Sequence, residues 1–163
     1  MDNSFKEVLW NQFGASLDML ENALAACPDN LWDTEAKFWH TAYHVLFWTD
    51  YYLSSEPEKF SPIPPFKMAA SDISEAIPGT AYSKAELLAY VQGCRDKCHQ
   101  LIKGLTDEIA NQRWINDRKD YPFIEIMLYN MRHVQHHTAQ LNLLLRQGMN
   151  DAPKWVSRAS MNL

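Results

Sequence analysis

Apolar side chains recur at helical spacing along four long stretches, and this period constrains the fold more than any other feature of the sequence. The first stretch begins at a capping box, Ser4-Phe5-Lys6-Glu7, and ends at Pro28. The other three span about residues 33–53, 83–104 and 120–147. Only five glycines are present, and the alternation typical of strands is scarce. The sequence therefore predicts an all-α fold, a four-helix bundle.

A proline-rich segment separates the second and third predicted helices. Residues 54–80 hold five of the eight prolines, so they cannot form one helix. A connection of this length can cross the whole bundle, which would let the two flanking helices run parallel. Long loops of this kind often serve function, and this one is a candidate lid over a site. We expect a single domain over residues 1–163, which is long enough to bury a core.

The charge balance and the cysteines limit the compartment and the partners. A net charge of −5 and a pI near 5.6 argue against nucleic acid or an anionic membrane as a partner. No signal peptide and no stretch of about 18 apolar residues are visible. Three cysteines are an odd number and form no disulfide framework, which indicates reduced thiols in a cytoplasmic protein.

Two of those cysteines have a histidine beside them. Cys94 and Cys98 lie one helical turn apart and His99 follows, a spacing that a soft metal ion could use. Small buried residues on the core face of a helix explain the same pattern. We favour the second interpretation.

Three of the six histidines fall within five residues of the last predicted helix, at positions 133, 136 and 137. With His133 at zero and a step of about 100° per residue, His137 lies near ~40° and the apolar Ile126 near ~20°. His133 and His137 therefore share the core face of that helix. His136, near about −60°, lies at the rim of the same face.

The second predicted helix supplies further candidates. His44 is centred on an apolar face of segment 33–53, and His40 lies one turn before it. A histidine from this segment meeting His133 and His137 would complete a set of three imidazoles. Such a set suits zinc, nickel, copper or iron and leaves coordination positions open. The alternative is that these histidines are hydrogen-bonded residues of the core.

Two motifs resemble the DinB/YfiT-like superfamily of metal-binding four-helix bundles. The first is His44-Val45-Leu46-Phe47-Trp48-Thr49-Asp50-Tyr51-Tyr52-Leu53, and the second is His133-x-x-His136-His137-x-x-Gln140-Leu141. The order of predicted elements fits that family over nearly the whole chain. One departure is Ala139, because the family often has glycine before the glutamine.

The resemblance implies a metal site and an assembly. It implies that His44, His133 and His137 bind a divalent metal, zinc or nickel ahead of iron or copper. His136 would lie beside the site as a candidate catalytic proton carrier, with His40 as a second candidate. The resemblance also implies an up-down-down-up bundle that forms a homodimer. Some relatives are S-transferases that use low-molecular-weight thiols.

These observations lead to two main hypotheses about function. The first is a metal-dependent thiol S-transferase or hydrolase acting on a small electrophilic substrate, with a low-molecular-weight thiol as a partner. The second is a non-catalytic metal-binding module of a stress response, in which the metal stabilises the bundle. A third is an interaction protein with structural histidines. The sequence places no carboxylate at the site, since Asp50 points away from His44.

Overall fold

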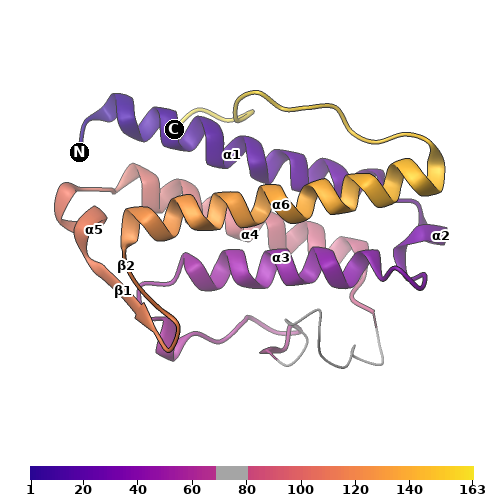
Figure 1. The fold of residues 1–163 in the computed structure, drawn as a ribbon, viewed down its shortest axis with the longest axis horizontal. Coiled ribbons are helices and arrows are strands. Elements are labelled where there is room, and N and C mark those ends of the chain that lie inside the picture. The colour runs from indigo at the N-terminus through magenta and orange to yellow at the C-terminus, as the bar shows by residue number, and fades with distance from the viewer. Residues whose placement is uncertain (69–80) are drawn as a thin grey trace.

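A computed structural model describes residues 1–68 and 81–163, and this part of the chain is mostly helical. Its long helices are α1 (Asn3–Ala26), α3 (Phe38–Tyr52), α4 (Lys84–Lys103) and α6 (Phe123–Met149). They lie alongside one another, and in Figure 1 α3 and α4 run opposite to α1 and α6. Both α1 and α3 contact α4 and α6. The all-α class is confirmed, apart from one small two-stranded sheet.

Helix starts depend on the capping residues. Ser83 caps α4 in a capping box with Glu86, as the sequence predicts. The predicted box at the first helix is wrong by two residues, because Asp2, not Ser4, is the N-cap of α1 and accepts the backbone N–H of Ser4. Helix α6 extends through Gly148 to Met149 and ends at Asn150, whose φ of 58° is left-handed.

The helix predicted over residues 33–53 begins late in the structure. A separate short helix, α2 (Asp29–Trp32), precedes it, and α3 starts only at Phe38. Between them, Asp33 Oδ1 accepts hydrogen bonds of 2.8 Å from both Lys37 Nζ and Trp39 Nε1. Lys37 itself has a left-handed φ of 50°. The Asp33 side chain thus stabilises a non-helical segment, residues 33–37, where the sequence predicts the first turns of the helix.

A hairpin that the sequence analysis did not predict precedes α6. After a short helix, α5 (Asp107–Asn111), the strands β1 (Arg113–Asn116) and β2 (Lys119–Pro122) pair antiparallel. Asn116 Oδ1 accepts the backbone N–H groups of Arg118 and Lys119 at 2.9 and 2.8 Å, which closes the turn. The predicted helix start at Asp120 is therefore wrong, since that residue pairs with Ile115 in the sheet.

The proline-rich connection packs on α3 and α4 over its described part. It contains one 3₁₀ turn, η1 (Pro57–Lys59), and the ring of Phe66 stacks on those of Tyr43 and Tyr90. Together with α4, residues 63–66 line a pocket of about 320 Å³. Residues 69–80 of the predicted crossover lie outside the described residues. None of the described helices is long and apolar enough to cross a membrane.

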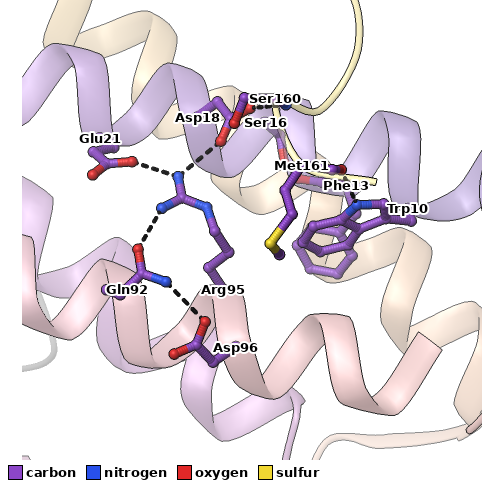
Figure 2. Close-up of polar contacts among 10 residues, drawn as sticks. All are labelled: Trp10, Phe13, Ser16, Asp18, Glu21, Gln92, Arg95, Asp96, Ser160 and Met161. Atoms are coloured by element: carbon purple, nitrogen blue, oxygen red, sulfur yellow. Dashed lines mark hydrogen bonds and ion pairs between the residues drawn. The ribbon is translucent and has the colours of Figure 1, made fainter. Parts of the chain in front are cut away.

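An arginine of α4 makes a buried ion pair with α1 (Figure 2). The Nη2 of Arg95 donates to Asp18 Oδ1 at 2.8 Å and to Glu21 Oε2 at 2.6 Å, while its Nη1 donates to Gln92. The Arg95 side chain is only 8% exposed and that of Asp18 10%. This charged contact therefore lies within the interface of the two helices.

The C-terminal tail, residues 150–163, returns along α1 (Figure 1). The backbone N–H of Ser160 donates to Asp18 Oδ2 at 2.7 Å, and Trp10 Nε1 donates to the carbonyl of Met161 at 2.6 Å (Figure 2). The tail lies so close that a Cβ on Gly14 would be 2.6 Å from the Cβ of Ala159. Glycine at position 14 therefore permits the contact between the tail and α1.

We expect Gly93→Ala to stabilise the protein by about 0.5–1 kcal/mol. Gly93 lies inside α4 at an exposed position, and a Cβ added there meets nothing within 4 Å. The alanine therefore gains helix propensity without a clash. Urea denaturation measures the change in the free energy of unfolding. Gly14→Ala is the matched control and is expected to destabilise, so equal effects of the two substitutions would contradict this account.

Candidate metal centre

Three imidazoles from two helices converge in the structure. His44 of α3 and His133 and His137 of α6 each offer a ring nitrogen, and these three atoms lie within 4.8 Å of one another. The Nε2 atoms of His133 and His44 are 3.3 Å apart. The ring centroids are separated by 4.6 to 5.2 Å. Within the described residues this is the one group of three or more potential ligands so arranged.

Packing between α3 and α6 brings these side chains together. His133 and His137 are one turn apart on α6 and share a face, as the helical projection predicts. Near them, Asn130 Nδ2 of α6 donates to the carbonyl of Thr49 in α3 at 3.0 Å. Because Asn130 is fully buried, this bond fixes how the two helices pack next to the histidines.

A glutamine orients one of the imidazoles. Gln140 Oε1 lies 2.7 Å from His137 Nδ1, so that nitrogen carries the proton and donates. The Nε2 of His137 is then unprotonated and has a lone pair for a ligand bond. Metal-binding histidines commonly have an outer partner of this kind. Gln140 of the predicted motif therefore has a defined positioning role.

The environment favours the neutral form of His133 and His137. The pKa of His133 is lowered to about 3, first by burial and then by the charges of His137 and His44. Burial also lowers the pKa of His137, against the opposing effect of its hydrogen bond to Gln140. A neutral imidazole is the form that binds a metal. His133 and His137 are therefore in the form that can coordinate a metal ion near neutral pH.

We expect the metal-free protein to lose stability as the pH falls below about 6.5. His133 titrates near 3 when folded but at its ordinary value when unfolded, so acid protonates the unfolded chain first. The resulting loss for this one group between pH 7 and 5 is about 2 kcal/mol. Urea titrations with chelator at both pH values measure it. In His133→Phe the loss should shrink by that amount, and an unchanged pH dependence would contradict the burial of a neutral imidazole.

A surface pocket of about 580 Å³ opens beside the cluster. Among the described residues, its lining comes from α6 and contains no carboxylate: Tyr129, Arg132, His133, Gln135, His136 and Ala139. At one end, Lys119 Nζ lies 4.9 Å from the ring centroid of Tyr129 and 5.5 Å from that of Tyr52. The histidines are thus bordered by an aromatic and cationic surface.

Comparison with known proteins gives the family. The family model of the DinB superfamily matches residues 12–141, which include all three converging histidines. The chain belongs to the DinB superfamily. No significant match to a curated protein or to a solved structure was found.

The DinB match agrees with the resemblance based on the two histidine motifs, and the structure brings the residues of those motifs together. His44, not His40, meets the histidines of α6. His40 is buried, with its ring 5.3 Å from that of Trp39. His136 is exposed at the rim, and its ring centroid lies 4.9 Å from that of His137.

Other candidate residues lie away from the centre. Cys94 and Cys98 are buried free thiols of the core, and His99 lies against Trp10, so these residues form no metal site. The carboxylate of Asp50 pairs with Lys97 at 2.6 Å. The described part of the proline-rich loop does not line the histidine pocket, so residues 54–68 do not form the predicted lid over it.

Sequence reasoning missed two residues beside this DinB site. Lys119 reaches it from the unpredicted hairpin, and Tyr129 lines the pocket one turn before His133. The projection of α6 could have identified Tyr129, since positions 129, 133 and 136 lie on adjoining parts of one face. The only signal for the hairpin is the Asn116-Asp117 pair, which is typical of a turn.

Proposed function

We propose that this DinB protein binds one divalent metal ion through His44, His133 and His137. The observation that carries the proposal is the convergence of their three ligand atoms within 4.8 Å. Neutral imidazoles suit zinc and nickel, and also iron and copper. Three protein ligands on one side of an ion leave coordination positions for a small molecule.

We propose further that the site catalyses hydrolysis or thiol S-transfer on a small electrophilic substrate. A divalent ion held by three imidazoles is a Lewis acid that lowers the pKa of a water or thiol ligand, which yields a nucleophile at neutral pH. The pocket beside His133 gives the substrate access. His136 lines this pocket and is exposed, so its imidazole is the candidate that carries protons to and from solvent.

The architecture and assembly belong to the same proposal. The four long helices would form one domain over residues 1–163, an up-down-down-up bundle that works as a cytoplasmic homodimer. The opposed directions of the helix pairs support that topology (Figure 1). The free cysteines support a reducing compartment. A low-molecular-weight thiol is the proposed partner of the site.

A second function, a metal that only stabilises the bundle, is favoured by the pocket chemistry. The pocket lining that the structure describes includes no carboxylate to act as a general base, and Asp50 is paired with Lys97. A metal that bridges α3 and α6 would then add its binding free energy to that of folding. Loss of metal would lower stability without removing any reaction.

Cobalt titration of the untagged, chelator-treated protein tests metal binding. We expect one equivalent to produce visible absorption bands, and His44→Ala to lose them. Metal-loaded protein is then assayed for thiol transfer and for ester and amide hydrolysis. Activity that disappears in His136→Ala while cobalt binding remains supports the enzyme. Metal binding that raises the melting temperature, without any turnover, supports the stabilising role and contradicts catalysis.

A further inference from the structure

Two cations, Arg132 and Lys119, lie at the histidine pocket of this acidic chain. Six lysine and arginine side chains form ion pairs in the described part of the structure: Lys37, Lys59, Lys84, Arg95, Lys97 and Arg113. Arg132 and Lys119 pair with no carboxylate of residues 1–68 or 81–163. Six of the fifteen basic side chains are thus paired, and what distinguishes Arg132 and Lys119 is their position at the pocket.

Arg132 lies within the pocket itself. It lines the same cavity as His133 and His136, and it is an exposed residue. A guanidinium offers a planar set of donors that matches an anionic oxygen group in two parallel hydrogen bonds. No carboxylate of residues 1–68 or 81–163 lines the cavity to neutralise the charge of Arg132.

Lys119 adds a second charge at the Tyr129 end of the pocket. Its ammonium lies over the rings of Tyr129 and Tyr52, and its side chain is half-buried. Its backbone N–H is held by Asn116 at 2.8 Å in the hairpin turn. These contacts with the two rings and within the hairpin turn distinguish Lys119 from a lysine that is fully surrounded by solvent. The hairpin therefore presents Lys119 to the aromatic edge of the pocket in a defined position.

We propose that this pocket binds a small organic anion, and that Arg132 and Lys119 hold its carboxylate or phosphate group. The inference rests on the proposed function in one respect: the reacting end of the bound molecule would face a metal ion held by the three histidines. It narrows the substrate class from a small electrophile or thiol to one that carries a negative charge. Arg132 and Lys119 are then specificity residues that a neutral analogue cannot use.

Thiol probes of matched size test the proposal on the cobalt-loaded protein. Binding of 3-mercaptopropionate and of its neutral amide is followed by the change in the cobalt spectrum. We expect the acid to bind about tenfold more tightly, and the preference to weaken as salt screens the charges. Arg132→Gln and Lys119→Gln should each reduce the ratio, and the double variant should bring it near one. Arg146→Gln, on the same helix but outside the pocket, should leave it unchanged.

A metal-free arm separates this inference from the proposed function. The chelator-treated protein is titrated with glutarate, inorganic phosphate and neutral glutaramide, with amide NMR shifts near residue 132 as the readout. Shifts with either anion but not with glutaramide support the site even if cobalt does not bind, and the tighter anion identifies the group. Two results would overturn the anion site. One is that the cobalt-loaded protein binds 3-mercaptopropionate and its amide equally tightly, and the other is that Arg146→Gln also abolishes the preference for the acid.

Discussion

Replacing His137 with alanine should lower the affinity for zinc by more than about 100-fold. Loss of an outer partner of a ligand already costs about 10- to 100-fold, and the ligand itself contributes more. His137 is the most buried of the three histidines, and Gln140 fixes its ring. Without its imidazole, only His44 and His133 remain to hold the ion. Competition with a chromophoric chelator measures the affinity.

His136→Ala is the matched control for that experiment. Its imidazole lies next to that of His137 in sequence, but it is exposed at the rim and outside the converging group. We expect its zinc affinity to stay within a few-fold of wild type. Equal losses in the two variants would show that the rim histidine is a ligand, and equal retention would show that neither is.

Replacing Arg95 with methionine is expected to destabilise the protein by about 3–5 kcal/mol. The substitution keeps much of the aliphatic side chain but removes the charge that faces Asp18 and Glu21. Asp18 would then be a buried carboxylate with only the backbone N–H of Ser160 as a donor (Figure 2). Chemical denaturation monitored by tryptophan fluorescence gives the free energy of unfolding.

The same substitution at an exposed ion pair provides the comparison. Arg113 and Asp120 have side chains 50% and 62% exposed, so Arg113→Met should cost no more than about 1 kcal/mol. The double variant Asp18→Asn, Arg95→Met should recover part of the loss, because it leaves no unpaired charge. A small effect at Arg95, similar to that at Arg113, would show that the buried pair is not what stabilises the contact between α1 and α4.

The placement of the histidines was accessible from the sequence because it follows from helix geometry. Each residue of an α-helix is rotated by a fixed angle from the one before it, and this angle determines which side chains of α6 share a face. The grouping of His133 and His137 therefore needs no knowledge of the tertiary structure. The family match covers both histidine motifs and agrees with that projection. The residues alone left His40 open beside His44, the resemblance favoured His44, and the packing of α3 on α6 brings His44 and not His40 to the other two histidines.

The elements that were missed depend on contacts between distant parts of the chain. Trp114 of the hairpin is buried, and its Nε1 donates to the carbonyl of Ser54 at 2.9 Å, so the hairpin is held by a segment 60 residues away. Strands of four residues also give too short an alternation to detect. The break before α3 depends on Asp33, whose hydrogen bonds override the helical pattern. Consequently, sequence reasoning predicted the histidines but not the hairpin that brings Lys119 to them.

The metal content of the untagged protein tests the central claim most directly. Purification without chelator, followed by elemental analysis, should find close to one equivalent of zinc or nickel in wild type. The triple variant of His44, His133 and His137 to alanine should contain none, and EDTA should lower the melting temperature of wild type alone. A wild-type protein that is free of metal, takes up none when zinc or nickel is added, and melts identically with and without EDTA would contradict the metal centre.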